Sequence, residues 1–206
     1  MYQEDIEQWE KSMLAYVSDW RNFSGKTQKD TSKIRVEVEK IISSNPDRPR
    51  LRIIMGGLFK VEAGLIIEKL KQQGMAREQR GRDTSYIEAI NKLNENFDAA
   101  LELNEEILLL DDFRLISGVA TSADIRVKVF RQMIKLWNDG KRFEGIGSDP
   151  VIDFDYKTYS QIVTAYVDEN RYDEALSIIN EMEEKFPTMQ FEIDLGRQRI
   201  TRYLHD

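Results

Sequence analysis

Hydrophobic residues recur at every third or fourth position along most of the chain, which is the spacing of one face of an α-helix. Glycine and proline, which interrupt helices, number only 11 and 4. The sequence therefore predicts an all-α fold, either a helical bundle or a short α-solenoid. The predicted helices span residues 3–23, 31–44, 50–73, 85–110, 122–138 and 188–204, with a short helix at 112–119 and two helices between 156 and 187.

The predicted helix 50–73 is apolar nearly all round in its first half, so we expect it to be central and covered on most sides. Gly56 and Gly57 lie in that half, although each costs a helix about 1 kcal/mol relative to alanine. Either another helix crosses closely there, or a ligand approaches the backbone. We favour the helix crossing.

Two polar motifs in the middle of the chain predict helix ends. Ser85 followed by Glu88 has the pattern of a capping box and predicts the start of the helix 85–110. Asp111 and Asp112 at the far end invite a metal hypothesis, but no further carboxylates stand at ligand spacing. We therefore expect an acidic pair in solvent and no metal site.

Composition excludes several kinds of chemistry. The chain has no cysteine, and its one histidine is the penultimate residue, so neither thiolate chemistry nor histidine-based metal binding and catalysis is expected. No pair of carboxylates is placed on an apolar face. We predict no catalytic residues and no cofactor, and a carboxylate-based enzyme is the weakest hypothesis.

The net charge of −7 is unevenly distributed. Residues 48–82 contain nine Lys and Arg against three Glu, a balance of +6, whereas residues 144–194 contain 13 Asp and Glu against three basic residues, a balance of −10. The polar segment 75–83 carries Arg77, Arg80 and Arg82 and is predicted to be an exposed loop. These arginines could bind phosphate or an acidic peptide, or could simply be solvated.

The segment Tyr156–Pro187 reads as two short amphipathic helices folded back on each other, with a break at residues 168–170. Ala175 is small enough for the two helices to approach closely, and Pro187 ends the second. The positions that define the pattern are Tyr159, Ile162, Tyr166, Ala175, Ile179, Met182 and Pro187.

This spacing resembles the tetratricopeptide repeat, which places Trp, Leu, Tyr, Ala, Phe, Ala and Pro at the corresponding positions. Val163 and Met182 depart from the family, which has small residues there. The start at Tyr159, the segment 174–176 and Met182 are also similar to a pentatricopeptide repeat. An ordinary helical pair is the alternative, since any helical hairpin needs similar residues.

The tetratricopeptide resemblance implies a protein-binding adaptor or scaffold, because the first helix of each repeat lines a groove for a peptide or helix. The residues that would face this groove are Lys157, Ser160, Gln161, Thr164, Val167 and Asp168. The pentatricopeptide resemblance implies RNA binding, with Ser160 and Gln190 reading a base. The acidic surroundings would repel phosphate, so we rank protein binding first.

We expect a helical body at 1–139, a loop at 140–154 that acts as a hinge, and a C-terminal unit at 155–206, within one continuous domain. The helix 188–204 is expected to cover the hairpin, with Phe191 inward and Arg197 in solvent. The start of the chain lacks a signal peptide and no long apolar run is present, so a soluble, cytoplasmic protein is expected. An organellar location after removal of a presequence and self-association are both left open.

Overall fold

The computed structural model describes residues 3–18, 28–103, 108–143 and 154–205, and these residues form α-helices joined by turns and short connections, with no β-strand among them. The predicted all-α fold is confirmed. The chain divides into two compact units, Met1–Thr121 and Ser122–Asp206. The second unit begins before the helix 122–138, which the sequence analysis placed in the helical body.

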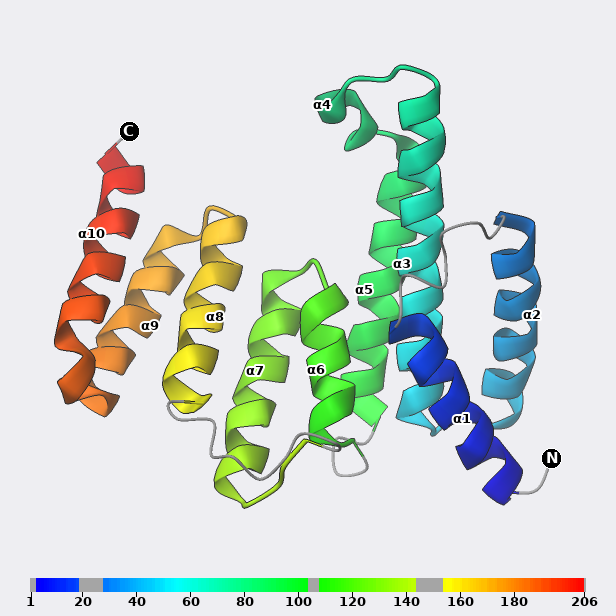
Figure 1. Ribbon diagram of the computed structural model, residues 1–206, viewed down its shortest axis with the longest axis horizontal. Coiled ribbons are helices and arrows are strands. Elements are labelled where there is room, and N and C mark those ends of the chain that lie inside the picture. Colours follow the sequence, from blue (N-terminus) through cyan, green and yellow to red (C-terminus); the bar gives the residue numbers. More distant parts are fainter. Residues whose placement is uncertain (1–2, 19–27, 104–107, 144–153, 206) are drawn as a thin grey trace. The chain divides into compact units, whose positions relative to one another are not determined.

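The first unit is built around a long helix, α3. Its helices are α1 (Gln3–Ser18), α2 (Gln28–Ser44), α3 (Pro49–Gln72), α4 (Arg77–Arg80), α5 (Thr84–Leu103) and α6 (Leu110–Val119). Helices α1, α2, α5 and α6 all pack against α3, and α5 runs beside it over most of its length (Figure 1). Leu51, Ile53 and Ile54 are fully buried. The predicted central position of this helix is therefore confirmed.

The two glycines in α3 allow its neighbours to approach. A Cβ atom on Gly56 would lie 2.7 Å from Cδ1 of Phe97 in α5, and one on Gly57 would lie 2.8 Å from Cβ of Val17 in α1. Both distances are shorter than van der Waals contact, so a side chain at either position would displace a packed neighbour. The glycines serve helix crossing, as predicted.

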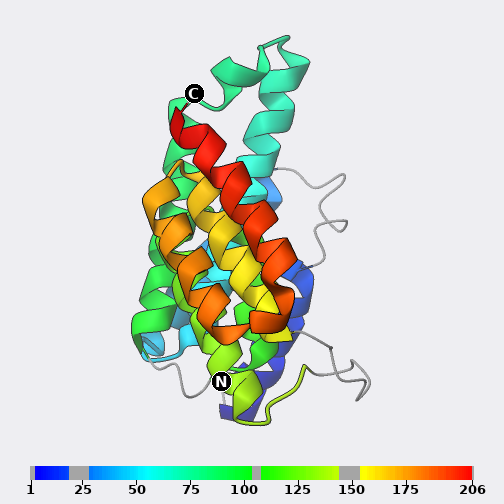
Figure 2. The same ribbon diagram turned by 90° about the vertical axis from the view of Figure 1, so that its left-hand side faces the viewer.

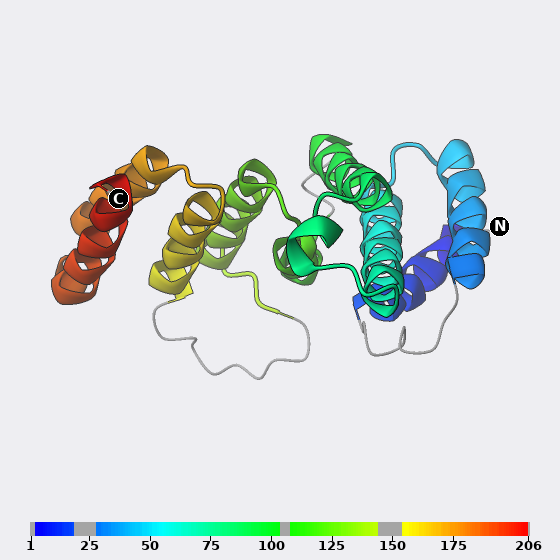
Figure 3. The same ribbon diagram turned by 90° about the horizontal axis from the view of Figure 1, so that it is seen from above.

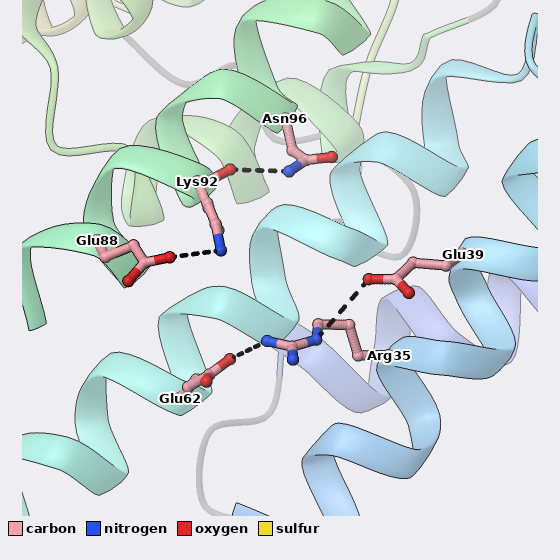
Figure 4. A network of polar contacts seen from close by, with 6 residues as sticks. All are labelled: Arg35, Glu39, Glu62, Glu88, Lys92 and Asn96. Carbon is pink, nitrogen blue, oxygen red and sulfur yellow. Dashed lines mark hydrogen bonds and ion pairs between the residues drawn. The ribbon is translucent and has the colours of Figure 1, made fainter. Parts of the chain in front are cut away.

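Charged residues also join α2 to α3. Arg35 of α2 reaches Glu62 of α3, with 2.6 Å between Nη1 and Oε2, while Lys92 of α5 pairs with Glu88 on its own helix (Figure 4). Arg35 lies 5.3 Å and Lys92 5.8 Å from the centre of the Phe59 ring. The edge of the apolar core at Phe59 is thus flanked by two cations, an arrangement that favours an aromatic residue there.

The sequence-based helix 85–110 differs from the structure at both ends. The Oδ1 atom of Asp83, and not the side chain of Ser85, accepts the N–H of Tyr86 at 3.1 Å, so Asp83 caps α5. Helix α5 is described as far as Leu103, and Leu108 and Leu109, which precede α6, are not helical, with an extended backbone at Leu109. The prediction of one helix to Leu110 was wrong because apolar residues keep a helical spacing across the break.

Asp112 explains why a new helix begins at Leu110. Its Oδ2 atom accepts the N–H of Leu109 at 2.9 Å and two hydrogen bonds from Arg50, at 3.1 Å from Nε and 3.0 Å from Nη2. Asp112 is only 6% exposed. The predicted solvent-exposed acidic pair is therefore wrong for Asp112, which caps α6 and fastens it to the start of α3.

The second unit consists of α7 (Ala123–Asn138), α8 (Phe154–Asp168), α9 (Tyr172–Lys185), a 3₁₀ turn at Pro187–Met189, and α10 (Gln190–His205). Helix α8 packs on α7, α9 on α8 and α10 on α9 (Figures 1 and 3). Ile162, Ala165 and Ala175 are fully buried between them. The expected loop at 140–154 lies mostly outside the described residues.

The predicted orientation of α10 is wrong for Phe191 and for Arg197. Ile193 and Ile200 are buried, whereas Phe191 is 72% exposed. Arg197, expected in solvent, is directed to α9, where it donates a hydrogen bond to Asn180 at 2.8 Å and pairs with Glu183. The prediction failed because apolar residues occur on both faces of this helix, so spacing alone does not identify the inner one.

Candidate functional site

The sequence-predicted groove residues lie along one side of α8. Lys157, Gln161 and Thr164 are exposed, and they follow one another at the four- and three-residue steps that place side chains on one helix face. Ser160 and Val167 lie beside this line and are half-buried. We call the three exposed residues together with Ser160 and Val167 the α8 stripe.

The polar groups of the α8 stripe differ in their availability to a partner. The hydroxyls of Ser160 and Thr164 donate hydrogen bonds to the carbonyl oxygens of Tyr156, at 3.0 Å, and Ser160, at 2.9 Å. Lys157 and Gln161 form no hydrogen bond or ion pair with other residues in the described part of the chain. The ammonium and the amide are therefore the groups that an incoming molecule would meet first.

Asp168, the last predicted groove residue, is already engaged. Its Oδ2 atom pairs with Nη1 of Arg126 of α7 at 2.7 Å. The adjacent Glu169 accepts the N–H of Ala123 at 2.6 Å, at the beginning of α7. The C-terminal end of α8 is thus fastened to the N-terminal end of α7, and Asp168 contributes to that attachment.

The buried side of α8 is held by a three-residue polar cluster. Arg131 of α7 and Glu181 of α9 form a bidentate ion pair, with 2.8 Å between Nη1 and Oε1 and 2.5 Å between Nη2 and Oε2. The hydroxyl of Tyr159 donates to Oε1 of Glu181 at 2.6 Å and accepts from Nη1 of Arg131 at 2.8 Å. One cluster therefore joins α7, α8 and α9.

Both acidic members of this cluster have shifted pKa values. The hydrogen bond from Arg131 lowers the pKa of the Glu181 carboxyl below its usual value. Burial, followed by the hydrogen bond that it makes to Glu181, raises the pKa of Tyr159 to about 12. At neutral pH the cluster thus contains a carboxylate, a guanidinium and a neutral phenol, which suits a structural role.

A second attachment lies at the opposite end of α9. Arg171 pairs with Asp124 of α7 at 2.7 Å and with Glu174 at 2.9 Å, and its guanidinium lies 4.8 Å from the centre of the Tyr166 ring. Together with the Tyr159 cluster, Arg171 fixes α7, α8 and α9 as a preformed scaffold beneath the α8 stripe.

Sequence reasoning missed Arg126, Arg131 and Glu181 as elements of this scaffold. Arg126 lies on the same face of α7 as the buried Val129 and Met133, an unusual position for a charge and a signal that the sequence does contain. Arg131 and Glu181 are 50 residues apart, so their pairing depends on the tertiary fold.

The arginines predicted as an anion-binding patch belong to the first unit. Arg77 and Arg82 are exposed and Arg80 is half-buried, and none of them pairs with another described residue. The segment contains the one-turn helix α4, where a loop was predicted. Other arginines in the basic region are occupied, since Arg48 is paired with the buried Glu10 and Arg50 with Asp112.

Neither a metal cluster nor a membrane span is found among the described residues. No group of three His, Cys, Asp or Glu side chains there could hold a metal ion. No helix of the described chain combines the length and the apolar character needed to cross a membrane.

Comparison with known proteins adds no relative. No protein-family model matches the sequence, and no similar characterised protein or solved structure was found.

Proposed function

We propose that the unit Ser122–Asp206 binds a protein or peptide along the α8 stripe, and that the chain acts as a non-enzymatic adaptor or scaffold subunit. One observation carries this proposal: Lys157 and Gln161 stand exposed, without a bond to any other described residue, on a helix whose other sides are fixed by α7 and α9. A rigid helix with free donors loses little conformational entropy on binding. The similarity of the segment 156–187 to a tetratricopeptide repeat supports the same function.

The chemistry of the α8 stripe indicates the kind of partner. Lys157 supplies a positive charge and Gln161 an amide that both donates and accepts. A peptide with an acidic side chain and an exposed backbone would satisfy both groups. Val167 at the other end gives a small apolar contact.

The proposal is tested by affinity capture with the full chain, comparing the wild type with the double variant Lys157→Glu/Gln161→Glu. The matched control, Lys135→Glu/Ser177→Glu, makes the same change in net charge at exposed positions of α7 and α9. We expect the α8 variant to lose a partner that the wild type and the control retain, with unchanged circular dichroism. Equal capture by all three proteins would show that the α8 stripe is not the binding surface.

A second candidate function, RNA binding, rests on a different observation. Arg77, Arg80 and Arg82 are unpaired among the described residues, and arginine is well suited to phosphate. The test is binding of labelled single-stranded RNA at increasing salt concentration. The wild type is compared with the triple variant Arg77→Gln/Arg80→Gln/Arg82→Gln, which removes the three charges. Binding that weakens steeply with salt and is lost in the variant would favour this function over protein binding at α8.

A further inference from the structure

Helix α10 has apolar residues on the side opposite to its core contacts. Ile193 and Ile200 are 1% and 2% exposed, and Gly196 lies 3.3 Å, measured from the position of a Cβ atom, from Cδ1 of Ile179 in α9. Phe191 and Leu195 are 72% and 51% exposed. In Figure 2, α10 is the red helix nearest the viewer.

Helical periodicity places Phe191 and Leu195 in one line with Gln198 and Arg202. All four side chains are exposed. A single exposed apolar residue needs no explanation, but two neighbouring ones directly opposite the core make this line an unusual outer face for a covering helix. We call these four residues the α10 line.

Charges along the edge of the α10 line have opposite sign at its two ends. Glu192 stands beside Phe191 near the N-terminal end, and Arg199 stands on the same edge seven positions later, about 10 Å along the helix axis. Both are exposed, and neither forms an ion pair with another described residue. Arg197, by contrast, is directed to α9 and is occupied by Glu183 and Asn180.

We propose that a second copy of this chain docks on α10, with the two α10 helices antiparallel across a two-fold axis. An antiparallel arrangement brings the N-terminal half of one helix against the C-terminal half of the other. Glu192 then meets the partner's Arg199, and the Phe191 ring meets the partner's Arg202, which provides a cation–π contact. Each pairing occurs twice, because a two-fold interface is self-complementary.

The two copies of Leu195 flank the centre of this interface. On the opposite edge, Asp194 of one copy lies beside Gln198 of the other. A parallel two-fold arrangement would instead place the Glu192 edge of one helix against the opposite edge of the other, where Glu192 would lie near the partner's Asp194, one carboxylate against another. Charge complementarity therefore selects the antiparallel dimer.

The small area of α10 limits the affinity of the proposed dimer. Helix α10 has 16 residues and is about 24 Å long, so one face of it offers less than the roughly 800 Å² per partner of a standard stable interface. We therefore expect a weak, concentration-dependent dimer, populated at tens to hundreds of micromolar, which strengthens as the salt concentration falls. The interface uses a surface different from the α8 stripe and does not depend on the proposed function.

The decisive experiment mixes two single-charge variants of the full chain. Alone, Glu192→Arg places two Arg–Arg contacts in the dimer and Arg199→Glu places two Glu–Glu contacts, so each should dimerise at least about fivefold more weakly than the wild type. In the mixed dimer both contacts join opposite charges. Sedimentation equilibrium of the equimolar mixture should therefore show dimerisation at least as strong as that of the wild type.

Two further variants separate this interface from general adhesion. Leu195→Glu should abolish the dimer, whereas Glu184→Arg, which makes the same charge change as Glu192→Arg at an exposed position of α9, should leave it unchanged. Circular dichroism checks that each variant is folded. The proposal is overturned if the wild type remains monomeric at several hundred micromolar, if Leu195→Glu still dimerises, or if the mixture associates no more strongly than its components.

Discussion

The Phe97 ring of α5 fills the space that a side chain at position 56 of α3 would need, and the residue there is Gly56. A Cβ atom at position 56 would lie 2.7 Å from Cδ1 of Phe97, which is fully buried. The ring thus packs directly on the backbone of the central helix. This contact explains why α3 contains a residue that otherwise weakens a helix.

Replacing Gly56 by alanine should destabilise the protein. The added methyl group forces the Phe97 ring or one of the two helices to move, and overpacking of this kind costs about 1–3 kcal/mol. Denaturant unfolding followed by circular dichroism would measure the loss.

Gly64→Ala is the matched control, since Gly64 lies in the same helix with no atom within 4 Å of its Cβ position. This variant should gain about 0.5–1 kcal/mol from helix propensity. If both substitutions stabilise the protein, Phe97 does not pack on the glycine as described.

Removing the Asp112 carboxylate should loosen α6. Asp112→Ala leaves Arg50 without its partner and the N–H of Leu109 without an acceptor, and breaking such a buried pair should cost about 2–3 kcal/mol, since Arg50 retains some access to water. Asp112→Asn should cost less, because the amide oxygen can still accept the N–H. Unfolding of both variants in denaturant would measure this order.

A double-mutant cycle with Arg50→Ala identifies the interaction responsible. If Asp112 acts through Arg50, the two substitutions together should cost clearly less than the sum of their separate effects. Strict additivity would mean that capping of α6 alone accounts for the loss.

Sequence periodicity predicted those features that depend on one helix at a time. The apolar residues Leu51, Ile53 and Ile54 indicated a central helix, and the helical spacing of Lys157 and Gln161 put them on one side of α8, where both are exposed. In each case the spacing of side chains along one helix contains the necessary information.

Features that depend on distant residues could not be predicted in this way. Asp112 looked like a solvated helix end because its partner, Arg50, is 62 positions earlier. Asp168 looked free, although Arg126 of the preceding helix occupies it. The outward direction of Phe191 follows from which face of α10 packs on α9, and the sequence of α10 alone offers both faces.

Acid should weaken the second unit through Glu181. Its pKa is lowered in the folded protein, chiefly by Arg131, so its contribution to stability is present above the unfolded pKa of about 4.3 and is lost as the pH falls through the lower, folded pKa. Glu181→Gln removes this titration. The variant should therefore be less stable than the wild type at pH 7, and the difference should shrink in acid.

Urea unfolding midpoints at several pH values between neutral and strongly acidic would measure the convergence. Glu184→Gln serves as the control, because Glu184 is exposed on the same helix. If the difference in unfolding midpoint between the wild type and Glu181→Gln stays constant over this pH range, the ion pair is not its source.

Alkali should act on the same cluster through Tyr159. The folded protein raises the pKa of this phenol to about 12, above the value of about 10 in an unfolded chain. The stabilising contribution is therefore complete below pH of about 10 and is lost as the pH rises towards the folded pKa, since the unfolded chain ionises first. Tyr159→Phe cannot ionise, so its stability should fall less steeply above this pH.

Tyr159→Phe also removes the hydrogen bond to Glu181, which should lower the free energy of unfolding by about 1 kcal/mol at neutral pH. The two stability curves should therefore approach each other with rising pH. Burial also raises the pKa of Tyr156, so Tyr159→Phe should reduce the alkaline loss without removing it. Tyr203→Phe, at a half-exposed position, tests whether the effect is specific: a convergence equally large in that variant would mean that burial of Tyr159 in the cluster is not its cause.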